Sequence, residues 1–244
     1  MRLFIIALLC LSSMQFGFAQ DDKFLPKHKG QLLEKVGFII DYDTINLLPN
    51  WVAYELNDYE TESVEKRKTH YSKDPYVSNC PSHVKYKYSG YDRGHLKPAA
   101  DSKSNNQQME DCCLMSNITP QTKELNQNIW KDLEYNARAL AKKYNSIYIV
   151  TGRSNEFIDS LDSGIMVPSY YWKSVLIYTG NETIIESFSI PNTYSKHDSL
   201  SNYFISVDEL ELKINLDLFL QLPDSIEINV ESVQESKLKE LLNK

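Results

Sequence analysis

The chain has 244 residues, and 42% of them are hydrophobic, which supplies enough apolar side chains for a sizeable core and excludes disorder as its overall state. Its 26 Lys and Arg residues against 33 Asp and Glu residues give a formal net charge of −7. This sign excludes bulk electrostatic attraction as the means of holding nucleic acid, so any contact with a polyanion needs a local basic patch.

The N-terminal segment 1–19 predicts a secretory signal peptide. Arg2 precedes an apolar run over 3–11, and small residues follow at Gly17 and Ala19. The run falls short of the roughly 20 apolar residues that cross a bilayer, so we expect no membrane segment in the mature form. We expect cleavage near Ala19, a polar lead-in over 20–34 and a single domain over 35–244.

Three cysteines lie outside the predicted signal peptide, and export places them where disulfides form. The odd number allows one disulfide and one free thiol. We expect Cys80 to pair with either Cys112 or Cys113. Because the adjacent cysteines lack the spacing of zinc fingers, the sequence argues against a cysteine metal site.

Runs rich in β-branched and aromatic residues predict six strands, at 36–42, 51–56, 84–88, 147–151, 171–178 and 184–190. Three further stretches predict helices, at 119–144, 206–212 and 232–242. The last two begin with capping boxes, in which Ser206 pairs with Glu209 and Ser232 with Glu235. The polar stretch 101–111 predicts a long surface loop. Together these elements indicate one α+β domain.

His95 lies in a segment with unusual neighbours. Histidine titrates near neutral pH and can act as a general base, although a single histidine is more often structural. Here Asp92, Arg93 and Gly94 directly precede it. Glycine permits close backbone approach, and the guanidinium matches a phosphate or, alternatively, forms a surface ion pair with Asp92.

The predicted helix at 119–144 places a stripe of residues at every fourth position, three of them polar: Asn126, Trp130, Glu134 and Arg138. Apolar residues beside this stripe predict the core-facing side: Ile129, Leu133, Ala137 and Leu140. An asparagine oxygen can ligate a hard cation such as Mg²⁺. The alternatives are a solvated face with a Glu134–Arg138 ion pair, and a tryptophan that belongs to the core.

Three motifs, at 92–95, 116–121 and 125–134, together resemble the DNA/RNA non-specific endonucleases, the ββα-metal nuclease family that includes secreted bacterial nucleases and endonuclease G. Further blocks in the same order extend the resemblance over residues 35–222. It implies an α+β fold with a mainly antiparallel central sheet flanked by helices.

The resemblance also implies roles for individual residues. His95 matches the general base, and Asn126 the direct protein ligand of Mg²⁺, for which Mn²⁺ can substitute. Glu134 matches the residue that orients water at the metal, and Arg138 the residue that stabilises charge on the phosphate or leaving group. The family's supporting positions match Arg93, Asn117 and Asp92, and its upstream phosphate-binding arginine matches Arg67.

Lys97 is also expected to bind substrate, because basic residues cluster around the histidine motif: Lys85, Lys87, Arg93, Lys97 and Lys103. Ordinary solvated surface is the alternative. The resulting hypothesis is a secreted, Mg²⁺-dependent endonuclease that cleaves DNA and RNA without preference for sequence or sugar. A catalytically silent nucleic-acid-binding module of the same fold is the alternative, and the sequence identifies no inhibitor protein.

Overall fold

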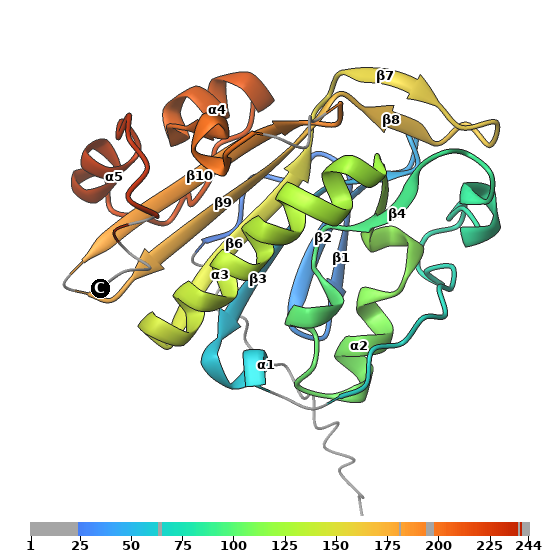
Figure 1. Cartoon of the computed structure of the whole chain (residues 1–244), viewed down its shortest axis with the longest axis horizontal. Coiled ribbons are helices and arrows are strands. Elements are labelled where there is room, and N and C mark those ends of the chain that lie inside the picture. The colour runs from blue at the N-terminus through green and yellow to red at the C-terminus, as the bar shows by residue number, and fades with distance from the viewer. Residues whose placement is uncertain (1–23, 63–64, 181, 194–197, 239, 241–244) are drawn as a thin grey trace, which may run out of the picture.

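The computed structural model describes residues 24–62, 65–180, 182–193, 198–238 and 240, so the predicted signal peptide lies outside the described residues. A seven-stranded antiparallel sheet forms the centre of the fold (Figure 1). In spatial order its strands are β1 (Gln31–Lys35), β2 (Phe38–Asp43), β3 (Leu48–Asn57), β6 (Ser146–Arg153), β9 (Tyr170–Tyr178), β10 (Thr183–Pro191) and β11 (Phe204–Ile205).

Helices cover both faces of this sheet. Helix α3 (Trp130–Tyr144) runs along one face in front of β6 (Figure 1). Successive residues of a strand point to opposite faces, so Ile149 joins the core beneath α3 while Val150 joins the core of the other face. That second core also contains residues of α4 (Val207–Ile214), and α5 (Asp224–Val230) lies beside β10. We call these the α3 face and the α4 face.

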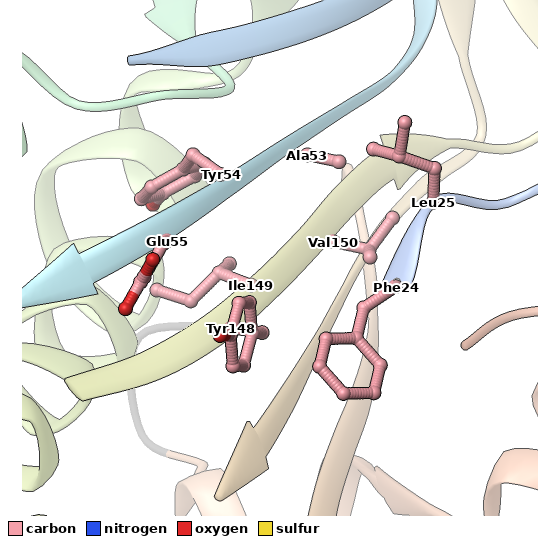
Figure 2. Close-up of a pocket in the computed structure, with 8 residues that line it drawn as sticks. All are labelled: Phe24, Leu25, Ala53, Tyr54, Glu55, Tyr148, Ile149 and Val150. Atoms are coloured by element: carbon pink, nitrogen blue, oxygen red, sulfur yellow. The ribbon is translucent and has the colours of Figure 1, made fainter. Parts of the chain in front are cut away.

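The end of the expected lead-in is part of the fold rather than a loose tail. Phe24 is buried on the α4 face, and its ring lies 4.5 Å from that of Tyr148. Figure 2 shows Phe24 and Leu25 beside Ala53 and Val150, where they line a small pocket over β3 and β6. Strand β1 then occupies the last positions of the same segment.

A two-stranded hairpin carries the histidine motif. It pairs β4 (Asp92–His95) with β5 (Ile118–Gln121), and the chain between them forms α2 (Asn106–Cys112) and two short 3-10 helices, Ala99–Asp101 and Met115–Asn117. A second hairpin pairs β7 (Phe157–Ser160) with β8 (Met166–Pro168). Helix α1 (Asp58–Glu62), the 3-10 helices His83–Tyr86 and Leu200–Tyr203, and the π-helical turn Leu125–Ile129 complete the described elements. None of the helices in the described ranges is long and apolar enough to cross a membrane.

The α+β class with a mainly antiparallel central sheet is confirmed, as are five of the six predicted strands. The strand prediction at 84–88 is wrong, because the segment forms a 3-10 helix and Tyr88 adopts a left-handed φ of 65°. The loop prediction at 101–111 is wrong in its second half. There Asn105 accepts a hydrogen bond from the Gln108 amide and so caps α2.

The helix predictions hold in part. Ser206 caps α4 as expected by accepting a hydrogen bond from the Glu209 amide. The long helix ends at Tyr144 as predicted but starts only after β5, because Thr119 and Pro120 pair with β4. The predicted capping box at Ser232 is wrong, since the Ser232 hydroxyl donates to the Ile228 carbonyl and 232–237 are not helical. The remainder of that prediction falls largely on residues outside the description.

Candidate active site

The β4–β5 hairpin positions His95. Its register pairs His95 with Ile118 and Gly94 with Thr119. A Cβ at Gly94 would lie 2.2 Å from the side-chain oxygen of Gln121, closer than any real contact. Only glycine therefore lets the two strands approach with that glutamine between them.

Asn117 connects the segment after β4 to the segment before β5 through side-chain hydrogen bonds. Its side chain is fully buried, and its Oδ1 accepts a hydrogen bond of 2.9 Å from the Lys97 amide. Its Nδ2 donates to the carbonyl oxygens of Lys97, at 2.9 Å, and Cys112, at 2.8 Å. The segment that follows His95 is thus tied to the end of α2, which makes Asn117 a positioning residue.

Aromatic and cationic groups surround the imidazole. The Tyr71 ring lies 5.5 Å from the His95 ring, and the Arg93 guanidinium lies 4.8 Å from the centre of the Tyr71 ring. Arg67, which precedes the hairpin in the chain, hydrogen-bonds to the Tyr71 side chain. His95 itself is only 8% exposed, and its Nε2 is buried without a hydrogen-bond partner among the described residues.

A π-helical turn, Leu125–Ile129, holds Asn126 next to the hairpin. The Asp92 carboxylate accepts hydrogen bonds from Asn126 Nδ2, at 2.9 Å, and Gln127 Nε2, at 2.8 Å. The opposite end of the Asn126 amide, Oδ1, accepts no hydrogen bond from the described residues. Amide and carboxylate oxygens are the ligands that hard divalent cations prefer, so this arrangement fits such a cation.

Helix α3 buries its predicted apolar side, and Trp130 is fully buried as the core alternative proposed. Arg138 Nη1 contacts Asp101 Oδ1 at 2.8 Å, while Asp101 Oδ2 accepts a hydrogen bond of 2.9 Å from the Tyr54 hydroxyl. Asp101 is 1% exposed. The alternative of a Glu134–Arg138 ion pair is wrong in the described part of the chain, where Asp101 takes that role.

Glu134 on α3 and Lys173 on β9 interact electrostatically beneath the helix. Burial raises the pKa of Glu134 to about 7, and the cations of Lys173, Arg138 and Arg67 oppose that rise. Burial lowers the pKa of Lys173 to about 8, and Glu134 opposes that fall. The Lys173 ammonium lies 5.0 Å from the centre of the Trp130 ring.

Two sequence-based predictions are corrected by these positions. Lys97 is fully buried, where its ammonium donates to the Gly37 carbonyl at 3.1 Å and lies 4.3 Å from the centre of the Tyr54 ring, so it does not reach a substrate. The predicted disulfide is also wrong. All three cysteines are free, and Cys80 Sγ instead accepts a hydrogen bond from the Asp74 amide.

The structure joins the other predicted residues in smaller groups, such as Asp92 with Asn126, and adds residues that sequence reasoning missed. Lys173 could have been noticed in the sequence, because it is the lone charged residue in the apolar run of β9. Asp101 and Tyr71 could not have been noticed, since an aspartate in a polar stretch and a tyrosine in a polar segment are unremarkable until the fold places them.

The profile of the DNA/RNA non-specific endonuclease family matches residues 20–225, a span that contains every residue of this site. The chain belongs to that family. Its members are metal-dependent nucleases. A nuclease of Nostoc sp. is 31% identical over 216 residues, which cover 82% of this chain and 77% of the relative. The mitochondrial nuclease of Saccharomyces cerevisiae is 35% identical over 162 residues, 57% of this chain and 49% of that protein.

A solved structure shares the fold. In the crystal structure of the EndoG/EndoGI complex, one chain matches with a TM-score of 0.72 at 22% identity, covering 80% of this chain and 88% of that one. The predicted ββα-metal nuclease fold is thereby confirmed.

Proposed function

We propose that the protein is a secreted, Mg²⁺-dependent endonuclease that hydrolyses phosphodiester bonds in DNA and RNA without preference for sequence or sugar. The observation that carries the proposal is that β4 positions residues for two roles, metal binding and proton removal. At one end of the strand Asp92 orients the Asn126 amide with its oxygen free, and at the other end the hairpin holds His95.

His95 is the general base in this proposal. It removes the proton from the water that attacks phosphorus in line with the leaving oxygen, an effect worth about 10²- to 10⁴-fold in rate. A divalent cation held by Asn126 supplies stabilisation of the negative charge that develops on the phosphate and leaving oxygen. Asp92 fixes the side chain of Asn126, and Asn117 fixes the backbone beyond His95.

The cationic groups neutralise charge as the bond breaks. Arg138 is held by Asp101 and stabilises charge on the phosphate or leaving group, and Glu134 orients water. Arg67 is exposed and reaches toward Tyr71, where it contacts the scissile phosphate together with Arg93. Contacts made to phosphates rather than base edges explain why sequence and sugar matter little.

The net negative charge predicts only modest affinity for nucleic acid, and it predicts that this affinity falls as salt rises. We further propose that segment 1–19 is a signal peptide removed on export, and that 35–244 form the nuclease domain. N-terminal sequencing of the protein recovered from the culture medium tests this, with Gln20 as the expected first residue.

The experiment for the activity uses the purified mature chain on supercoiled plasmid and on single-stranded RNA, with Mg²⁺ or with EDTA, beside His95→Ala. We expect Mg²⁺-dependent degradation of both substrates that the variant lacks. Intact substrates from a folded protein across several divalent metals would overturn the proposal and leave the silent nucleic-acid-binding module.

A further inference from the structure

A second cluster of potential metal ligands lies directly behind the proposed base. Cys112 ends α2, and Cys113 is the residue that follows it; both are buried. Their sulfur atoms lie 3.9 Å apart. A ring nitrogen of His95 and the two sulfurs all lie within 4.8 Å of one another. We call these three residues the His–Cys cluster.

The geometry of the His–Cys cluster matches a tetrahedral ion of zinc type. With Zn–S bonds of about 2.3 Å, two sulfurs of a tetrahedral site lie about 3.8 Å apart. The observed separation is 3.9 Å, so the two cysteines need no rearrangement. The imidazole would supply a third ligand, which leaves one position for water. Sequence spacing argued against this site because the third ligand comes from β4, not from the cysteine segment.

The His95 side chain already interacts with Cys113, but one of its ring nitrogens has no partner among the described residues. His95 is more than nine-tenths buried, and its Nε2 has no hydrogen-bond partner among the described residues. A buried polar atom without a partner is uncommon and costs free energy. Asn117 also bonds to the Cys112 carbonyl and to the segment after His95, so the two halves of the cluster are held in fixed relation.

A metal at the His–Cys cluster would displace the thiol protons of Cys112 and Cys113. The thiolate is the form that binds metal. Mg²⁺ prefers oxygen ligands and therefore does not compete for this cluster.

We propose that His95, Cys112 and Cys113 bind a thiophilic divalent cation of the zinc type, and that this cation switches off the proposed base. Neutral imidazole has one nitrogen with a free lone pair, while the other carries the proton. When the lone pair ligates the metal, neither nitrogen can accept a proton from water. Thiol protons displaced on binding pass to solvent, and no electrons are transferred. The inhibition rests on the proposed role of His95, whereas the binding site does not.

The binding test uses the reduced, chelator-treated chain and Co²⁺ as a spectroscopic substitute for Zn²⁺. We expect thiolate-to-cobalt charge-transfer absorption at one ion per chain, bleached by Zn²⁺. Cys112→Ser and Cys113→Ser should each weaken Zn²⁺ binding by at least about 100-fold, since loss of an outer-shell partner alone costs 10- to 100-fold. Cys80→Ser is the matched control, because this buried cysteine lies outside the cluster and should bind as wild type does.

The activity test titrates Zn²⁺ into plasmid cleavage at constant Mg²⁺, with each variant compared with its own zinc-free rate. We expect Zn²⁺ to inhibit wild type and Cys80→Ser, and Cys112→Ser and Cys113→Ser to resist it. Circular dichroism verifies folding, and alanine replaces serine where serine unfolds the chain.

The outcomes separate the two proposals. Absent charge-transfer absorption, or equal Zn²⁺ affinity and equal inhibition in all variants, would overturn the His–Cys cluster as a metal site. Cysteine-dependent Co²⁺ absorption in a chain that cleaves nothing would instead overturn the proposed nuclease function and leave the metal site standing.

Discussion

Acidic side chains have different neighbours on the two faces of the central sheet. On the α3 face, buried acids have cationic partners: Asp101 contacts Arg138 at 2.8 Å, and Glu134 lies in the field of Lys173. On the α4 side, the carboxylates of Asp208, Glu211 and Glu231 gather within 4.8 Å of one another. Burial, together with the neighbouring carboxylates, raises the pKa of Glu231 to about 8.

The α3 face therefore combines acids with cations, whereas the described carboxyls on the α4 side lie close to other carboxyls. Opposite charges in close contact favour each other's ionised form, and the α3 face needs its cations if it is to receive a phosphate. Carboxyls crowded without cations take up protons instead. We therefore expect substitutions on the α3 face to lower activity or thermal stability, and substitutions on the α4 face to change the pH dependence of stability.

The largest expected effect follows from removal of the amide oxygen on the α3 face. Asn126→Ala should lower Mg²⁺-dependent plasmid cleavage by at least about 100-fold, because it deletes the proposed metal ligand. Gln127→Ala is the matched control, since Gln127 donates to the same Asp92 carboxylate but is exposed, and it should stay within a few-fold of wild type. Equal losses in both variants would show that Asp92, not a metal at Asn126, accounts for the effect.

The next effect concerns the paired charges. Asp101→Asn removes the carboxylate partner of Arg138 in a buried setting and should destabilise the fold by roughly 3 kcal/mol. For a chain of this size that corresponds to a fall in Tm of about 6–12 °C. Asp132→Asn, on the exposed side of α3, should leave the Tm within about a degree. Thermal unfolding followed by circular dichroism measures both, and an unchanged Tm in Asp101→Asn would refute the pairing.

A smaller effect should appear on the α4 side as the pH changes. The pKa of Glu231 is raised to about 8 in the fold from a reference of 4.5, so the folded state holds a proton that the unfolded state has lost between these values. Stability contributed by this group is therefore full below about pH 4.5 and is lost as pH rises through 8.

Glu231→Gln should flatten this decline, so that its Tm exceeds that of wild type by a few degrees at pH 9 and matches it near pH 4. Glu235→Gln changes an exposed carboxyl of the same segment and should follow the wild-type curve. Parallel curves for wild type and Glu231→Gln would contradict the assigned protonation.

The sequence predicted the centre of the fold better than its edges. Strands β6, β9 and β10 follow β-branched and aromatic runs that tertiary contacts reinforce, so their positions were predicted. The segment 84–88 has similar composition, yet Val84 and Tyr88 are exposed and none of the described strands pairs with it. A composition that favours a strand is therefore not sufficient, because a strand also needs a neighbouring strand to pair with.

The site was predictable where residues follow one another in a motif and not where the fold brings them together. Asp92, His95 and Asn126 lie in recognisable segments. The contact between Asp101 and Arg138 joins a short 3-10 helix to α3, and no local pattern encodes it. For Lys97 the prediction from the motif was wrong. Lys97 is close to His95 in sequence, but its side chain lies in the core, next to the Tyr54 ring.

Lys97 and Arg67 provide the finest test of the α3 face. Both are cations near the motif, but Lys97 is fully buried whereas Arg67 is exposed beside Tyr71. Each phosphate contact contributes about 0.9 to the slope of log K against log salt for duplex DNA. Arg67→Ala should therefore reduce that slope by about one contact, while Lys97→Met should leave it unchanged. Fluorescence anisotropy with a labelled duplex and Ca²⁺ in place of Mg²⁺ measures the slope. A lower slope in Lys97→Met would mean that the buried ammonium reaches the substrate after all, and that the hairpin opens when DNA binds.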